Sequence, residues 1–184
     1  MGIVRRIASA ALGDYSLFRV LALSAPAPAR AARYQCAELA DIAELAASGD
    51  PQIRSLAGYA TSAANCFVVR LDSQIAAACC YGPGGSYKRS HLWPVQAGEA
   101  RLDYVATAVA FRGRGMAQDL IRQSSAAICA RGFAPLYALV YHSNAASHRA
   151  FERAGWRQIA WVGEAVPMGR RIRVTCSLRD RGAA

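Results

Sequence analysis

The segment from Leu102 to Trp156 constrains this chain most, because it places two distinctive blocks on either side of a strand. An apolar strand leads into the turn Phe111 to Ala117 (FRGRGMA), and an amphipathic helix, a second strand and the block Asn144 to Trp156 follow. Glycines let a backbone approach an anion closely, and the free N–H groups and dipole at a helix start attract it. The turn is therefore predicted to cradle a pyrophosphate, and the second block to hold the rest of a long ligand.

At these two blocks the chain resembles the GNAT superfamily of acyl-CoA-dependent N-acyltransferases. The pyrophosphate motif of that family is Arg or Gln, two residues, Gly, one residue, then Gly or Ala. Its later signature is an Asn that opens a helix, an aromatic residue seven positions on, a basic residue and a Gly-aromatic pair. The matching residues here are Arg112, Gly115 and Ala117, and then Asn144, Phe151, Arg153, Gly155 and Trp156. One short glycine motif is weak evidence, whereas two blocks in the right order are specific.

Hydrophobic periodicity predicts a strand, two helices, three strands, a helix, a strand, a helix and two strands. The expected ranges are 15–23, 32–47, 52–62, 66–71, 75–81, 99–109, 116–130, 136–141, 145–154, 156–162 and 171–178. This order matches the GNAT fold, which implies an α/β (α+β) architecture. In it, a mixed and mostly antiparallel sheet, flanked by helices, contains a central splayed pair of parallel strands. A length of 184 residues fits one domain, 1–184, with 1–13 as an accessory N-terminal helix.

The chain is strongly basic, with a net charge of 22 − 12 = +10. This favours anionic ligands, coenzyme A among them. Nucleic acid is the less favoured partner, because the arginines are spread along the chain without interleaved aromatic residues. No apolar run is long enough to span a bilayer, so no membrane association is expected.

The six cysteines show neither a C-x-x-C pair nor a zinc-ligand spacing. We therefore expect reduced thiols in a cytoplasmic protein, and no metal. Arg5-Arg6 and the apolar stretch after them resemble a secretory signal, but Asp14 and Arg19 interrupt that stretch. His91 and His148 are expected at the surface.

The resemblance implies acetyl-CoA as the acyl donor and no metal in the reaction. Main-chain groups at the end of the strand before the turn are expected to pair with the pantetheine arm as an added strand does, and one N–H there to hold the thioester oxygen. The residues expected to bind the donor are Ala108, Val109, Phe111, Arg112, Gly113, Arg114, Gly115, Met116, Ala117, Asn144, Ser147, Phe151 and Arg153.

The acceptor amine must lose a proton before it attacks, and a carboxylate on the strand before the turn is the expected base. Asp103 is the first candidate and Glu99 the second, with His142 a further one at the end of the next strand. Many GNAT members carry a tyrosine where this chain has Phe151, and its hydroxyl protonates the departing thiolate. Phe151 has no such proton, so another group serves, or the thiolate leaves unprotonated.

The leading hypothesis is an N-acetyltransferase in which a primary amine attacks the thioester directly. A CoA-binding regulatory module with a degenerate catalytic site is the alternative from another class, and Phe151 is the residue that supports it. A transferase for longer acyl groups or O-acceptors is a third reading. The acceptor is expected to be an amine-bearing small molecule or peptide, and a homodimer is a further expectation.

Overall fold

The computed structural model describes residues 15–26, 28, 30–58, 60, 65–82 and 92–178. Its strands are β1 (Tyr15–Leu23), β2 (Cys36–Glu38), β3 (Asn65–Leu71), β4 (Gln74–Gly82), β5 (Ala100–Thr107), β6 (Leu136–Tyr141), β7 (Arg157–Ala165) and β8 (Ile172–Ser177). Its helices are α2 (Ala43–Ala46), α3 (Pro51–Leu56), α4 (Met116–Ala130) and α5 (Ala145–Arg153), with short 3-10 turns η2 (Val109–Phe111) and η3 (Pro167–Gly169). The expected accessory helix within 1–13 and His91 lie outside the described residues.

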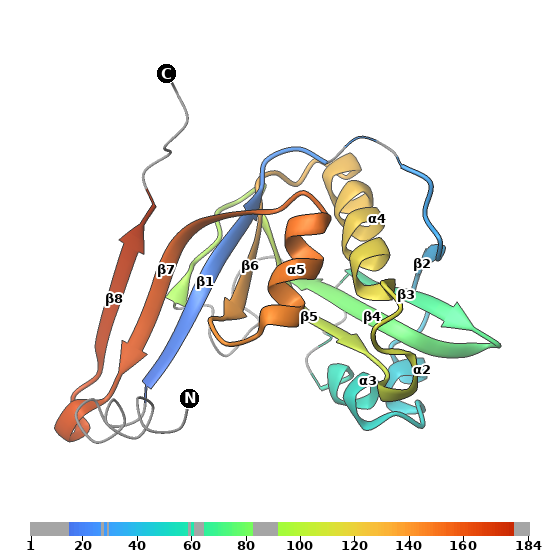
Figure 1. Cartoon of the computed structure of the whole chain (residues 1–184), viewed down its shortest axis with the longest axis horizontal. Helices are drawn as coiled ribbons and strands as arrows, with labels where there is room; N and C mark the ends of the chain where they lie inside the picture. Colours follow the sequence, from blue (N-terminus) through green and yellow to red (C-terminus); the bar gives the residue numbers. More distant parts are fainter. Residues whose placement is uncertain are drawn as a thin grey trace.

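One sheet contains all eight described strands, in the order β2-β3-β4-β5-β6-β1-β7-β8 (Figure 1). Every neighbouring pair is antiparallel except β5 and β6. Those two pair only where 100–102 lie beside 136–138, although β5 continues to Thr107 and β6 to Tyr141. The two strands therefore separate toward their carboxyl ends, which confirms the predicted splayed pair.

A bulge in β5 marks the place where the strands separate. Tyr81 of β4 pairs with Leu102, whereas Cys80 pairs with Tyr104. Asp103 is therefore an extra residue that pairs with no residue of β4. A bulge of this kind bends its strand and redirects the side chains beside it. The bulge therefore sets both the divergence of β5 from β6 and the direction of the Asp103 side chain.

Helices cover both faces of the sheet (Figure 1). On one face α4 buries Met116, Leu120, Ile121 and Ile128 against the central strands, as its 3.6-residue periodicity predicts. On the other, α2 and α3 bury Leu45, Ile53 and Leu56 against β3, β4 and β5. None of the helices in the described part of the chain is both long and apolar enough to cross a bilayer.

A polar network fastens α4 to the sheet within this core. The Tyr81 hydroxyl lies 3.1 Å from Ser124 Oγ and 3.0 Å from Ser125 Oγ. The indole N–H of Trp156 donates to Ser125 Oγ at 3.3 Å. These groups satisfy one another where water is excluded, so the buried hydroxyls cost little and fix the position of the helix.

The helix predicted over 32–47 is wrong in its first half. Residues 36–38 form the edge strand β2 against β3, and the helix begins only at Ala43. Side chains of α4 explain the difference. Asp119 accepts hydrogen bonds from the Arg33 and Tyr34 N–H groups, and Gln123 accepts one from the Cys36 N–H. These tertiary contacts satisfy the backbone in an extended form and override helix propensity. The second helix is also shorter than expected, since α3 ends at Leu56.

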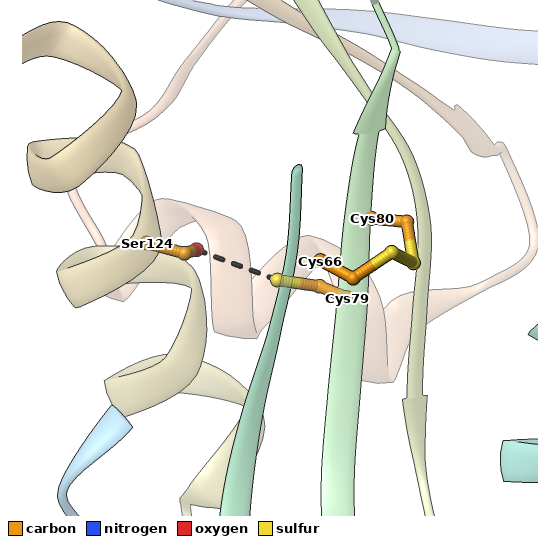
Figure 2. Close-up of a disulfide and its surroundings, with 4 residues drawn as sticks. All are labelled: Cys66, Cys79, Cys80 and Ser124. Carbon is orange, nitrogen blue, oxygen red and sulfur yellow. Dashed lines mark hydrogen bonds between the residues drawn. A yellow bond between two sulfur atoms is a disulfide. The ribbon is translucent and has the colours of Figure 1, made fainter. Parts of the chain in front are cut away.

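The prediction of six reduced thiols is wrong at one pair. Cys66 of β3 and Cys80 of β4 lie opposite each other in the ladder and form a disulfide (Figure 2). Adjacent Cys79 points to the other face of the sheet, where its thiol donates to Ser124 Oγ at 3.4 Å. Hairpin register brings Cys66 and Cys80 together, and the spacing of cysteines along the chain does not reveal it.

We expect four titratable thiols in the protein unfolded without reductant, and six after reduction, because Cys36, Cys79, Cys129 and Cys176 are free. Thiol titration in denaturant measures this number directly. The Cys66→Ser variant is the matched control and should show five thiols without reductant, since Cys80 loses its partner. Six thiols in the unreduced parent would contradict the bridge.

Candidate active site

The turn between β5 and α4 has the geometry of an anion cradle. Gly113 and Gly115 have φ of +77° and +85°, a conformation that favours glycine. Gly115 is the N-cap of α4, and no side chain caps this helix, whereas side chains of Asp50 and Asn144 cap α3 and α5. The N–H groups at the start of a 15-residue helix therefore remain available to an anion.

A cavity of about 590 Å³ opens over this turn and extends from the end of β5 to α5. Its wall is built from the end of β5, the turn, the start of α4, and α5 with the residue before it. The lining residues are Gln52, Val105, Ala106, Thr107, Phe111, Arg112, Gly113, Arg114, Gly115, Met116, Ala117, Gln118, Ile121, Asn144, Ala146, Ser147, Arg149, Ala150, Phe151 and Arg153. The charged side chains in that wall are four arginines, so the site suits a polyanion.

The second block of the sequence supplies the α5 side of the cavity. Asn144 caps α5, because its Oδ1 accepts a hydrogen bond from the Ser147 N–H at 3.1 Å. Phe151 is buried edge-on against Trp156, with ring centroids 5.1 Å apart. The predicted binding residues Asn144, Ser147, Phe151 and Arg153 thus share one wall.

Two of the predicted binding residues, Ala108 and Val109, lie outside this wall. The Ala108 N–H donates to the Ala76 carbonyl of β4 at 2.9 Å, and the Val109 N–H donates to Asp50 Oδ2 at 2.9 Å. Because main-chain groups alternate along a strand, those of Val105 and Thr107 face the gap beside β6. Both residues line the cavity. The main-chain groups on the open side of β5 therefore belong to Val105 and Thr107 rather than to Ala108 and Val109, and the Thr107 carbonyl accepts a hydrogen bond from Arg112 Nε at 3.3 Å.

Asp103 occupies the bulge and pairs with a buried arginine of its own strand. Arg101 Nε donates to Asp103 Oδ1 at 2.5 Å, and Arg101 Nη1 donates to the Trp93 carbonyl at 3.2 Å. The Arg101 side chain is only 2% exposed and that of Asp103 10%. Burial raises the pKa of Asp103, and the charge and hydrogen bond of Arg101 oppose that effect. The sequence gives no local signal for this pair, because charge alternation along a strand is common on solvated faces.

The other two candidate bases have partners away from the cavity. Glu99 precedes β5, and its carboxylate accepts hydrogen bonds from the Gln96 N–H at 2.7 Å and the Tyr137 hydroxyl at 3.3 Å. The ring Nδ1 of His142 lies 3.3 Å from the Leu17 carbonyl of β1, which requires a proton on that nitrogen. Of the three candidates, Asp103 is the closest along its strand to Val105, where the cavity wall begins.

The expectation that His148 is a surface residue is wrong. Its side chain is buried on the sheet-facing side of α5, three residues before Phe151 and on the same helical face. Its Nε2 donates to the Tyr141 carbonyl at 2.9 Å. Burial lowers the pKa of His148, so the neutral ring is favoured there.

Solved structures share this fold. A GNAT-family protein from Novosphingobium aromaticivorans is 23% identical with a TM-score of 0.61, and the match covers 83% of this chain and 64% of that one. The ribosomal-protein-S18-alanine N-acetyltransferase from Escherichia coli is 19% identical with a TM-score of 0.51, covering 83% and 99%. An acetyltransferase from Colwellia psychrerythraea is 14% identical with a TM-score of 0.56, covering 96% and 61%.

The chain thus spans less than two thirds of the first of these structures. Among curated proteins, none matches the chain significantly. The sequence profile of the Acetyltransferase (GNAT) family matches residues 33–156, which include β5, the turn, α4, β6 and α5. With that match and the splayed strands beside an uncapped helix, the chain belongs to the GNAT acetyltransferase family.

Proposed function

We propose that this protein is an N-acyltransferase that moves an acetyl group from acetyl-CoA to a primary amine. The observation that carries the proposal is the cavity itself, in which an uncapped helix start, two left-handed glycines and four arginines lie beside the end of β5, beyond the point where its pairing with β6 stops. Members of the family are acyltransferases. The cavity wall offers one place for the pyrophosphate of the donor and another for its pantetheine arm.

The phosphate end of the donor is assigned to the turn. Backbone N–H groups from Gly113 to Ala117 face the pyrophosphate, and Arg112 and Arg114 supply charge-assisted hydrogen bonds. The pantetheine arm then runs along β5, where the main-chain groups of Val105 and the N–H of Thr107 pair with it, while the Thr107 carbonyl accepts a hydrogen bond from Arg112 Nε at 3.3 Å. An N–H of this segment stabilises the oxygen of the thioester carbonyl as negative charge develops there.

Transfer needs a neutral amine. The amine nitrogen bonds to the thioester carbon, the carbon–sulfur bond breaks, and the thiolate departs. We assign the removal of the amine proton to Asp103, directly or through a water, since of the three candidates it is the nearest along β5 to Val105, where the cavity wall begins. No side chain is assigned to protonate the thiolate. The reference pKa of a thiol is near 8.5, which permits departure as the anion.

A CoA-binding module without turnover is the second candidate, and Phe151 is the observation that favours it. The ring is buried against Trp156 and carries no dissociable proton. Thiol release measured over a panel of amines, with acetyl and longer acyl donors, separates the two functions and also tests O-acceptors. Binding of CoA with no release for any acceptor would favour the module.

The proposal keeps several finer expectations. The acceptor is a small amine or a peptide with a free amino group. We retain a cytoplasmic location, although the Cys66–Cys80 bridge is more typical of an oxidising compartment. A homodimer is retained as well.

The direct test is a calorimetric titration with CoA and acetyl-CoA. We expect a dissociation constant on the order of micromolar. We expect it to rise as salt is added, because the contacts to the pyrophosphate are ionic and salt screens them. A titration that detects no interaction at low salt would overturn the proposed function.

A further inference from the structure

The Asp50 carboxylate joins two segments of the chain that both contribute to the donor cavity. Its Oδ1 accepts hydrogen bonds from the Gln52 N–H at 2.8 Å and the Ile53 N–H at 3.2 Å, and so caps α3. Its Oδ2 accepts the Val109 N–H at 2.9 Å, where the chain leaves β5 and enters η2. One side chain therefore ties the α2–α3 hairpin to the start of the phosphate turn.

Both segments that Asp50 joins reach the cavity wall. Gln52, whose N–H the carboxylate holds, lines the cavity from the α3 side. Phe111 and Arg112, which follow Val109 within three residues, line it from the turn. Val109 is 57% exposed, so packing does little to fix Val109 itself, whereas Ala108 is buried and Phe111 packs against the core. The hydrogen bond that the Val109 N–H donates to Asp50 thus anchors the one residue of 108–111 that is largely exposed yet held by a side chain outside the turn.

We propose that Asp50 is a positioning residue for donor binding, which holds the phosphate turn in its anion-binding conformation through the Val109 N–H. The proposal rests on the proposed function, because the turn must bind the pyrophosphate of an acyl-CoA. Asp50 does not touch the donor in this arrangement. It acts through the backbone of 109–112.

Because Asp50 is charged, the direction in which its removal changes CoA affinity distinguishes an electrostatic role from a positioning role. Desolvation raises the pKa of Asp50, but the hydrogen bonds from Val109, Ile53 and Gln52, together with the Arg112 charge, lower it below its usual value. The group is therefore an anion at neutral pH, near a site that binds anions. Removing it strengthens pyrophosphate binding by electrostatics alone, whereas losing the anchor weakens binding. A loss of affinity therefore identifies positioning.

The test variant is Asp50→Ser, which separates the capping of α3 from the hydrogen bond to the Val109 N–H. Serine caps helices as well as aspartate does, so α3 and the thermal midpoint should be preserved. Its short side chain has a single oxygen and does not reach Val109. We expect CoA to bind about tenfold more weakly in calorimetry, the factor appropriate to one hydrogen bond with a charged partner. The fragment 3′-phosphoadenosine 5′-diphosphate, which lacks the pantetheine arm, should weaken equally.

The matched control is Asp41→Ser in the same hairpin. Asp41 Oδ1 accepts the Ala43 N–H at 2.8 Å at the start of α2, so it also accepts a backbone N–H at a helix start but has no bond to the turn. CoA affinity should change less than about twofold in this variant, in keeping with an exposed charge distant from the turn. Asp50→Asn serves as a second test variant if Asp50→Ser folds poorly, since its single carboxamide oxygen cannot make both sets of bonds.

A double-mutant cycle isolates the bond itself. Val109→Pro removes the N–H that Asp50 accepts, and proline is suited to the first position of a helical turn after an extended residue such as Ala108 (ψ 140°). In the Val109→Pro background, Asp50→Ser should cause no further loss of CoA affinity, because only the electrostatic gain from removing the charge is left. The same tenfold loss in that background, or parent affinity in the single variant, would overturn the proposal. Failure of the parent to bind CoA would instead overturn the proposed function.

Discussion

Gly115→Glu is expected to abolish CoA binding while the domain stays folded. Gly115 is the N-cap of α4 with φ of +85°, and a Cβ added there meets no atom within 4 Å. The glutamate side chain therefore enters open space, but that space is the proposed pyrophosphate position. Its carboxylate occupies the anion-binding position at the start of α4 and repels the phosphates. We therefore expect CoA affinity to fall by more than about 100-fold in calorimetry.

Backbone strain is the competing explanation, and Gly132→Glu controls for it. Gly132 follows the other end of α4 and has φ of +90°, and a Cβ added to it likewise meets no atom within 4 Å. Both variants force an L-residue into the left-handed region at roughly 1–2 kcal/mol. Their thermal midpoints should therefore fall by similar amounts, and only Gly115→Glu should lose CoA binding. A Gly115→Glu protein that binds CoA like the parent would place the cradle elsewhere.

Asp103→Asn is expected to lower turnover by about 100-fold or more while CoA affinity stays nearly unchanged. The amide keeps an oxygen for Arg101 Nε but cannot take a proton from the acceptor amine. Donor binding is assigned to the turn, to α5 and to main-chain groups of β5, none of which involves the Asp103 side chain, so the substitution should spare it. Turnover is measured by thiol release with saturating donor, and affinity by calorimetry.

The pH profile distinguishes a base from a residue that only packs. Burial is the largest influence on Asp103 and raises its pKa above the ordinary 3.8, against the opposing effect of Arg101. A base acts only when ionised, so parental turnover should fall as the pH drops through that raised pKa. The deficit of Asp103→Asn should shrink at high pH, where more of the amine is already neutral.

Stability must be measured alongside turnover, because Asp103→Asn removes the carboxylate charge that pairs with the buried Arg101. A lower thermal midpoint is expected, and turnover is compared at temperatures where both proteins are folded. Glu99→Gln is the control for a nearby carboxylate and should have the smaller effect. Full activity of Asp103→Asn at neutral pH would transfer the role of base to Glu99, His142 or solvent.

Local sequence patterns determined much of this protein. The helix over 116–130 was predicted at its observed bounds, because its apolar residues recur at the helical period and glycines mark both ends. The hairpin of β3 and β4 and the final pair β7 and β8 were predicted for similar reasons. The turn and the α5 block were predicted to share a ligand, and they line one cavity.

Only the tertiary structure decided the features that depend on partners far along the chain. The strand β2 forms because α4 side chains satisfy its backbone, and the Cys66–Cys80 bridge because hairpin register brings two thiols together. The bulge at Asp103 and the bond between Asp50 and Val109 arise from pairing across elements. Periodicity records which face of an element is buried, but register and long-range hydrogen bonds are set by the fold as a whole.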